Sequence, residues 1–266
     1  ALENLYPGTP LADDIAGTRD SISDITIGNL HENFDLFYHP SQMHLLVIGK
    51  FDVDPILQVL KEYDQISQLP SIKMERFPVE KNEVKLNQSC RMDVATPKLA
   101  IGIRGNDDIK EEEKFRYKLM LKLLFSMMFG WTSQRFQSLY EAGKIDNSLT
   151  LEVEVEELFH FVILTMDTKE PVSLSHQFRS AIKQFDKDPD VNQEHLDTIK
   201  SEMFGDFLQG LNSLEYSATQ FDYFSDGSTS YDLPKILQSI SLQDIIKLGH
   251  KFIDQAEMVD YMIFQK

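Results

Sequence analysis

Cysteine is nearly absent from this sequence, since Cys90 is the only one among 266 residues. A single cysteine excludes an internal disulfide framework and any Cys-x-x-Cys metal site or redox pair. Because Cys90 lies in a strand-like segment, we interpret it as a small buried side chain rather than as a nucleophile.

Long apolar runs are also lacking. The longest, from Leu119 to Trp131, is interrupted by Lys122 and Ser126, and none reaches the roughly 18 residues that span a bilayer. The first residues show no signal-peptide pattern. We therefore expect a soluble, cytoplasmic chain that does not associate with membranes.

Positive charge is in deficit: 26 Lys and Arg face 43 Asp and Glu, which gives a net charge of −17. So acidic a protein disfavours binding to nucleic acid or to an anionic membrane. Hydrophobic residues make up 42% and aromatic residues 11% of the chain, which argues for a folded protein. The length fits one large domain or two of ordinary size.

The most recognisable catalytic signatures are missing as well. The seven histidines form no HExxH, HxxEH or HxH pattern, there is no GxSxG, and residues 102–105 match neither a Rossmann fingerprint nor a P-loop. Neighbours on a helix, such as His31 and Glu32, point about 100° apart and cannot share a metal. We therefore expect no catalytic residue, no metal site and no cofactor within this chain.

The acidic segment 186–197 offers oxygen ligands at positions 1, 3, 5, 9 and 12, which is the spacing of an EF-hand loop. Position 6 is Val191, where the calcium loop needs glycine, and position 12 is the short Asp197. A loop around Pro189 that caps the next helix explains the same residues. We therefore favour the capping loop over a calcium site.

Two distant segments of the chain resemble each other. Residues 21–49 and 239–266 both begin Ser-Ile-Ser and continue into an amphipathic helix, a polar link and a strand. The apolar helix faces are Ile27, Leu30, Phe34 and Phe37 in the first segment and Ile245, Leu248 and Phe252 in the second, with strands predicted over 43–48 and 258–264. The offset of 218 residues (239 − 21) suits a duplicated domain. Two unrelated helix–strand units are the alternative.

A duplication would leave the first copy incomplete. We predict that residues 1–68 are the carboxy-terminal remnant of a first domain, that 69–82 is a proline-containing linker, and that 83–266 is a complete second domain. The apolar faces of the remnant then need a partner, either in the second domain or in another chain.

The second domain alternates strands with helices in a way that predicts an α+β fold. We expect strands over 83–94 and 98–104, a hairpin of 149–155 with 159–166, and a last strand over 258–264. We expect helices over 106–129, 133–142, 171–185, 191–224 and 233–253. The result is an antiparallel or mixed sheet with its helices packed on one face.

Three stretches together resemble the insulinase-type zinc metallopeptidases, the inverted-zincin family that includes pitrilysin and the mitochondrial processing peptidases. The first is LYPGTPLADDIAGTRDSISDIT with NLHENFDLFYHPSQMHLLVIGKFD, which is similar to the family's sequence downstream of the zinc site. The second is GWTSQRFQSLYEAGKIDNS, which resembles the non-catalytic domain, and the third is the terminal helix and strand. Members of this family are built from duplicated α/β domains, so the resemblance agrees with the internal repeat.

The resemblance implies that zinc and its ligands lie in an upstream domain, outside this chain. Active members use an arginine and a tyrosine of the non-catalytic domain to contact substrate, and the matching positions here hold Tyr140 and Asn147, or Asp146 with a one-residue gap. Arg135 matches a neighbouring arginine of the motif, although an ion pair on the helix surface explains it equally well. We predict Arg135, Tyr140 and Asn147 as substrate-binding residues.

The family resemblance implies a non-catalytic half of a peptide-enclosing chamber, in which an extended peptide or unfolded protein adds as a strand to a sheet edge. The implied partner is a catalytic domain or a related subunit, in a homo- or hetero-dimer. The alternative is a non-enzymatic interaction subunit of the same fold. Whether the whole protein is a zinc peptidase is left open by this sequence.

Overall fold

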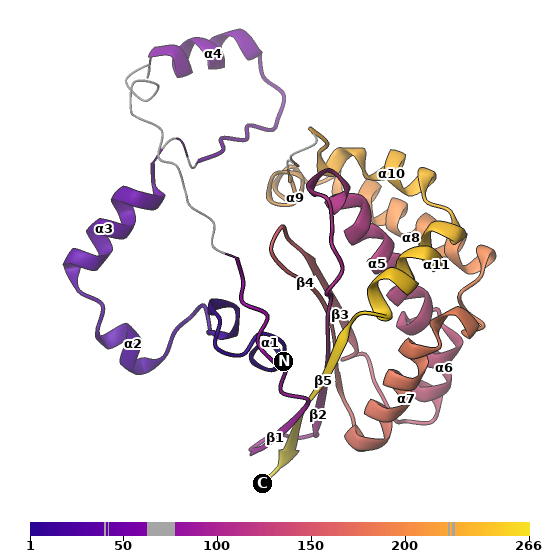
Figure 1. The fold of residues 1–266 in the computed structure, drawn as a ribbon. Helices are drawn as coiled ribbons and strands as arrows, with labels where there is room; N and C mark the ends of the chain where they lie inside the picture. Colours follow the sequence, from indigo (N-terminus) through magenta and orange to yellow (C-terminus); the bar gives the residue numbers. More distant parts are fainter. Residues whose placement is uncertain (40, 42, 63–77, 223, 225–226) are drawn as a thin grey trace. The chain divides into compact units, whose positions relative to one another are not determined.

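The computed structural model describes residues 1–39, 41, 43–62, 78–222, 224 and 227–266 (Figure 1). The chain divides into two compact units, one of residues 1–13, 79–208 and 222–266 and the other of 14–78 and 209–221. None of the helices in the described part of the chain is long and apolar enough to cross a membrane.

The first unit is built on a five-stranded mixed sheet. Its strands are β1 (Asn87–Met92), β2 (Lys98–Arg104), β3 (Thr150–Val155), β4 (His160–Asp167) and β5 (Glu257–Gln265), in the spatial order β1-β5-β2-β4-β3. The β1 and β5 strands are parallel, and every other neighbouring pair is antiparallel. The predicted hairpin and the terminal strand are confirmed. This sheet makes the fold α+β, as the sequence predicted.

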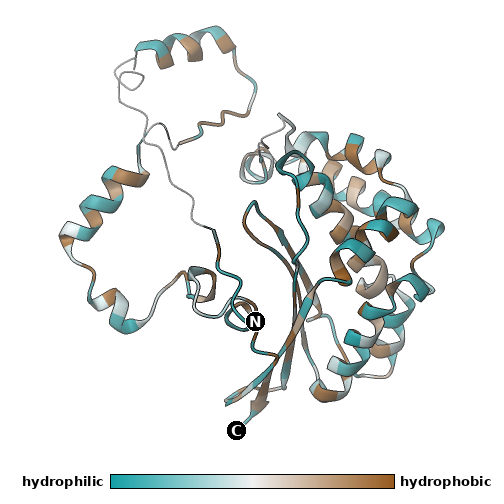
Figure 2. Cartoon of the chain, viewed as in Figure 1, coloured by the Kyte–Doolittle hydropathy of each residue, from teal (hydrophilic) through white to brown (hydrophobic). Residues whose placement is uncertain are grey.

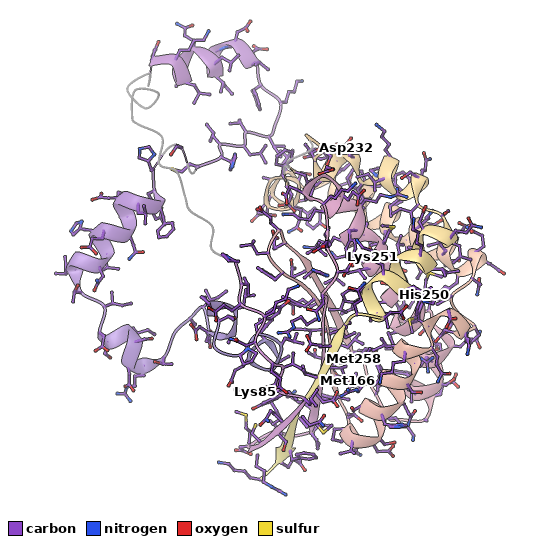
Figure 3. The ribbon with its side chains drawn as sticks, in the orientation of Figure 1. Lys85, Met166, Asp232, His250, Lys251 and Met258 are labelled. Carbon is purple, nitrogen blue, oxygen red and sulfur yellow. The ribbon has the colours of Figure 1, made fainter. Side chains whose placement is uncertain are left out.

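Helices cover one face of this sheet (Figure 1). They are α5 (Lys114–Phe129), α6 (Gln134–Glu141), α7 (Pro171–Lys183), α8 (Gln193–Gly210), α10 (Leu233–Ser239) and α11 (Leu242–Ile253), with short 3₁₀ turns at Glu111–Glu113, Phe185–Lys187 and Ser230–Asp232. The core between helices and sheet contains the fully buried Phe125, Phe178 and Phe252, with Met166 of β4 and Met258 of β5 (Figure 3).

Two of the predicted helices are interrupted. The pattern over 233–253 divides into α10 and α11 because Ile240 is extended and the side chain of Ser241 caps α11 by accepting the backbone N–H of Asp244. The single helix predicted over 191–224 is found as two helices: α8 ends at Gly210, and α9 (Leu214–Thr219) follows in the second unit. Polar capping residues therefore set helix boundaries even where the helical spacing of apolar residues continues without a break.

The opposite face of the sheet is covered by the start of the chain. Helix α1 (Leu2–Leu5) precedes the 3₁₀ turn Pro10–Ala12, and its Leu5 and Tyr6 are buried against the sheet. Gly102 of β2 makes room for this contact, since a Cβ there would lie 2.9 Å from Leu5 Cδ1. Residues 1–13 thus pack with the sheet of residues 87–265. The predicted linker lies mostly outside the described residues, and the domain boundaries stay a prediction.

The second unit carries α2 (Arg19–Ser23), α3 (Ile27–Phe37) and α4 (Val53–Glu62). The predicted helix over residues 27–37 is confirmed, and Thr26 caps it by accepting the N–H of Asn29 at 3.1 Å. The predicted strand over 43–48 is wrong: these residues form no strand, and no described segment pairs with them. An apolar segment becomes a strand only where a neighbouring strand satisfies its backbone groups.

The two similar helices differ in how they are packed. Ile245, Leu248 and Phe252 of α11 are 0%, 4% and 0% exposed. The matching Ile27, Leu30 and Phe34 of α3 are 76%, 61% and 58% exposed, and the apolar bands on α3 are visible in Figure 2. The same sequence pattern thus has a partner in one copy, while its counterpart is left open to solvent.

Candidate functional site

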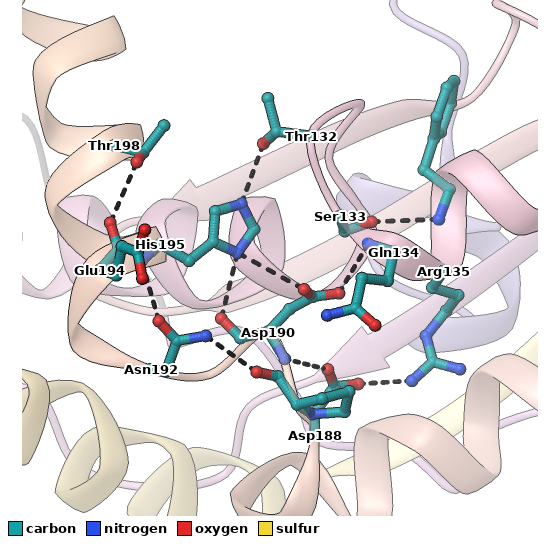
Figure 4. A network of polar contacts seen from close by, with 12 residues as sticks. Thr132, Ser133, Gln134, Arg135, Asp188, Asp190, Asn192, Glu194, His195 and Thr198 are labelled. Atoms are coloured by element: carbon teal, nitrogen blue, oxygen red, sulfur yellow. Dashed lines mark hydrogen bonds and ion pairs between the residues drawn. The ribbon is translucent and has the colours of Figure 1, made fainter.

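Arg135, one of the predicted substrate-binding residues, takes part in an ion pair within the fold. It lies on α6, and its guanidinium pairs with the buried carboxylate of Asp188 (Figure 4). The same guanidinium lies over the ring of Phe129, 5.7 Å from the ring centroid. These contacts hold α6 to the loop before α8. The substrate-binding role of Arg135 stays a prediction.

A wider polar network surrounds this ion pair (Figure 4). The backbone N–H of Gln134 donates to Asp190 Oδ2 at 2.8 Å. His195 of α8 contacts Thr132 Oγ1 through Nε2 at 3.0 Å and the backbone oxygen of Asp190 through Nδ1 at 3.1 Å. The network joins the start of α6 to the start of α8. We therefore assign these groups a role in stabilising the fold.

The segment that resembles a calcium loop uses its oxygens on protein donors. Asp188 Oδ1 accepts the N–H of Asp190 at 3.0 Å, and Asn192 Oδ1 accepts the N–H of His195 at 2.9 Å. The second contact is a helix N-cap. The capping loop predicted for this segment is confirmed.

Tyr140 and Asn147 are both exposed, as a substrate-binding role requires. Tyr140 stacks on Phe136, one turn earlier on α6, with ring centroids 5.8 Å apart. Asn147 lies in the turn before β3, where Asp146 Oδ1 accepts the N–H of Ser148 at 2.8 Å and holds the turn.

A pocket of about 240 Å³ opens beside Asn147. Its walls are the rings of Phe125, Phe129, Trp131 and Phe136, the side chains of Leu149, Leu151 and Leu164, and the polar residues Ser126, Asn147 and Thr150. Gly130 also lines it, and a Cβ there would lie 2.4 Å from the backbone oxygen of Ser126. The structure thus places Asn147 in the wall of an aromatic pocket, and Tyr140 stacks on Phe136 of the same wall. Arg135 instead belongs to the network around Asp188.

The pocket adjoins an open edge of the sheet. In the described part of the chain, β4 is the only strand that pairs with β3. At the hairpin, the N–H of Glu156 donates to the oxygen of Phe159 at 2.8 Å. Because hydrogen-bonded residues alternate along an antiparallel pair, Glu152 and Glu154 bond to β4, whereas the N–H and C=O groups of Leu151 and Val153 point away from it. These groups can accept a further strand.

Three lysines that no sequence motif marks as functional follow this edge. Lys114, Lys118 and Lys122 lie four residues apart on α5, and Glu152, Glu154 and Glu156 alternate along the neighbouring strand and its end. Each repeat was visible in the sequence. Only the packing of α5 against β3 shows that the two rows are neighbours.

A second polar cluster is buried where β2 ends. Asp107 contacts His160 Nε2 at 2.8 Å, accepts the hydroxyl of Tyr117 at 2.8 Å, and lies 3.4 Å from the ammonium of Lys251, which Figure 3 labels. Burial raises the pKa of Asp107, but the hydrogen bonds from His160 and Tyr117 outweigh burial and hold it below its usual value. The polar atoms of this cluster satisfy one another, so we assign it a structural role.

No metal site can be built from the residues that the structure describes, because nowhere in them do three or more His, Cys, Asp or Glu side chains gather to hold an ion. His160 and His195 are each engaged with an aspartate in the networks above. The donor set therefore does not fit a zinc ion, which prefers three or four such ligands. That zinc is held upstream of this chain stays a prediction.

The chain matches a known protein family. Residues 24–203 match the family model described as the peptidase M16 inactive domain. A curated Bacillus subtilis (strain 168) protein, described as the uncharacterized zinc protease YmfH, is 31% identical over 249 residues, covering 92% of this chain and 58% of that protein.

Solved structures share the fold. A putative M16-like peptidase from Alicyclobacillus acidocaldarius superposes with a TM-score of 0.81 at 20% identity, covering 100% of this chain and 64% of that one. The first half of the periplasmic protease PqqL from Escherichia coli gives a TM-score of 0.64 at 17% identity, covering 98% and 59%. The chain thus spans less than two thirds of each of these relatives.

Proposed function

The chain belongs to the peptidase M16 family, whose inactive domain it contains, and from this membership we propose that it forms the non-catalytic half of a peptide-enclosing chamber. An extended peptide or unfolded protein adds as a strand to the edge of β3, and zinc-dependent hydrolysis takes place in a catalytic domain outside this chain. The observation that carries the proposal is the open edge of β3 beside an aromatic pocket.

Strand addition at this edge has a specific physical basis. The outward backbone groups of Leu151 and Val153 offer N–H donors and C=O acceptors that no described segment uses. A peptide in extended form satisfies these groups whatever its sequence, and alternate side chains then enter neighbouring pockets. Exposed Asn147 lines the pocket, and exposed Tyr140 stacks on Phe136 of the pocket wall, which supports their proposed contact with the peptide.

Hydrogen exchange at single amides tests this binding mode. On addition of an unstructured ten-residue peptide, we expect the amides of Leu151 and Val153 to exchange more slowly. Those of Glu152 and Glu154 already bond to β4 and serve as an internal control. Binding that leaves both outward amides unchanged would contradict strand addition at β3.

The exposed apolar face of α3 supports a protein partner for the second unit. We propose that residues 14–62 pack against a catalytic domain or a related subunit of the same fold, which buries Leu30 and Phe34 as α11 buries its own apolar face. The proposed assembly is a homo- or hetero-dimer. A non-enzymatic interaction subunit remains a second candidate on the same observation. Sedimentation that gives a monomer at all concentrations, with α3 sensitive to protease, would contradict the dimer.

We propose a cytoplasmic location because the chain is acidic and has one cysteine. The PqqL protein that shares this fold is described as periplasmic. Cell fractionation with an antibody to this chain separates the two compartments. Recovery in the periplasmic fraction would overturn the proposal.

A further inference from the structure

The three lysines of α5 lie on one side of the helix. Lys114, Lys118 and Lys122 are spaced by four residues, so their side chains line up along the axis. This row lies at the side of α5 next to β3, because two of the lysines form ion pairs with glutamates there.

Those two ion pairs cover one half of the strand edge. Lys114 Nζ lies 3.1 Å from Glu156 Oε2, and Lys118 Nζ lies 2.8 Å from Glu154 Oε2. Glu154 pairs across the strands with Phe161, which belongs to the core on the face away from α5. The Lys118 side chain therefore passes around the open edge to reach it, and a strand added at this point would have to displace it.

The contacts also give the register between α5 and β3. Lys114 meets Glu156, Lys118 meets Glu154, and Ser126 lines the pocket with Thr150. Four helical residues advance about 6 Å and two strand residues about 7 Å. The two elements thus run antiparallel and nearly in step, which places Lys122 level with residues 152–153, between the bridged half of the edge and the pocket.

Lys122 differs from its two neighbours. Its ammonium makes no ion pair or hydrogen bond with any residue that the structure describes, although the side chain is half-buried. Burial lowers the pKa of Lys122, and the nearby charge of Lys118 lowers it further, against the opposing effect of Glu154 and Asp222. A half-buried cation without a contacting anion is stabilised by a carboxylate that a ligand brings.

The pocket lies one turn further along α5 and is apolar, whereas Lys122 offers a positive charge. Most of its wall is aromatic or aliphatic, and its volume is about 240 Å³. An apolar cavity of about 150 Å³ already holds benzene. A large apolar side chain therefore fits here, entering from a peptide paired beside Leu149 and Leu151.

We propose that this half of the β3 edge selects extended segments in which a large apolar side chain and an acidic side chain stand two positions apart. The apolar group fills the pocket, and the carboxylate pairs with Lys122. This rests on the proposed function, in which β3 receives an added strand, and it names the class of peptide that the edge prefers. Alternate residues of a strand point to the same side about 7 Å apart, which matches the step from the pocket to Lys122.

Fluorescence anisotropy with designed peptides tests the preference on the 266-residue chain. Labelled ten-residue peptides carry a central Phe-Thr-Glu or Glu-Thr-Phe, since a strand can add in either direction. Each peptide is compared with two single-residue variants, its twins: one has Gln in place of Glu, and the other has Ala in place of Phe. We expect the better Glu peptide to bind about fivefold more tightly than its Gln twin, because an ion pair of about 1 kcal/mol gives that ratio.

Two variants separate the two contacts. Lys122→Gln removes the preference for Glu over Gln and leaves the preference for Phe over Ala. Ser126→Leu fills the pocket and removes the preference for Phe. Lys247→Gln, at an exposed lysine of α11, is the matched control and changes neither ratio. Circular dichroism and urea unfolding check that each variant is folded.

The outcomes distinguish this preference from the proposed function. Peptides that bind and protect the amides of Leu151 and Val153, but with equal affinity for Glu and Gln twins, would overturn the preference alone. The same holds if Lys122→Gln and Lys247→Gln behave alike. No binding of any peptide would overturn the proposed function together with this inference.

Discussion

Arg104 shows how one buried side chain joins distant parts of the chain. It is 2% exposed and donates to the backbone oxygens of Leu5 at 2.7 Å and Asn82 at 2.9 Å. It also donates to Glu257 Oε2 at 3.0 Å, and its guanidinium lies over the ring of Tyr6. Residues near 5, 82, 104 and 257 are thereby fixed together on the sheet face away from the helices.

We predict that Arg104→Met lowers the free energy of unfolding by about 2–4 kcal/mol, because the buried carbonyl of Leu5 and the partly buried oxygens of Asn82 and Glu257 lose the hydrogen bonds that Arg104 donates. Residues 1–13 should also become more sensitive to protease. Urea unfolding and limited proteolysis measure both effects. Arg91→Met, at an exposed arginine that donates to the oxygen of Gln265, is the control, and equal effects of the two substitutions would contradict this account.

The carboxylate of Asp107 predicts a pH dependence of stability. Its pKa is lower in the folded chain than its ordinary value near 4. Its stabilising contribution is therefore complete above that ordinary value and is lost as the pH falls through the lowered folded pKa. We expect the difference in unfolding free energy between the native chain and Asp107→Asn to shrink between about pH 5 and pH 2. A difference that stays constant over this range would show that Asp107 is not held as a carboxylate by its neighbours.

At the residue scale, the sequence could suggest candidates but could not show their partners. Arg135 was matched both to a substrate-binding motif and to a surface ion pair, and only the structure shows that Asp188, 53 residues away in sequence, holds it. The sequence also could not show that Lys122 differs from its neighbours, because this depends on which lysines of α5 form ion pairs with the glutamates along β3 and at its end.

Among the elements, the most predictable were those whose signals are local. The β3–β4 hairpin follows from the alternation of Leu151, Val153 and Val155 with glutamates, and α6 follows from Ser133, whose side chain accepts the N–H of Phe136. The strand predicted over 43–48 failed because no described segment pairs with it. Pairing between segments is a long-range property that a local pattern does not contain.

The repeated helices allow a matched pair of substitutions. Phe34 of α3 and Phe252 of α11 hold equivalent places in the repeat, with Phe34 exposed and Phe252 buried. In the chain alone, we predict that Phe34→Asp changes the unfolding free energy by less than about 0.5 kcal/mol. Phe252→Asp should cost more than about 3 kcal/mol through lost packing and a buried charge.

Chemical denaturation of both variants measures this contrast. Were Phe34→Asp as costly as Phe252→Asp, the face of α3 would already be packed in the isolated chain, and the argument for a protein partner would be lost. Sedimentation of the Phe34→Asp variant supplies the complementary result, a weaker tendency to dimerise.

At the scale of the whole molecule, most of the confirmed predictions came from composition, the order of the predicted elements and the family resemblance. The α+β class, the mixed sheet and the membership of the chain in a peptidase family with an inactive domain are confirmed. The assignment of residues 1–68 to a first domain stays a prediction. The sequence left open whether its apolar side chains pack on the second domain or on another chain, and Leu5 and Tyr6 pack beside β2 and β5. That contact joins residues more than 90 positions apart, and it depends on Gly102 leaving space for Leu5.

The central claim is that this chain holds an extended peptide without cutting it. The most direct measurement incubates the purified 266-residue chain with a labelled peptide and zinc, follows binding by anisotropy and peptide length by mass spectrometry, and then measures the zinc retained after dialysis. We predict a bound and intact peptide with no stoichiometric zinc. Cleavage of the peptide by a chain that retains one zinc ion would contradict the account.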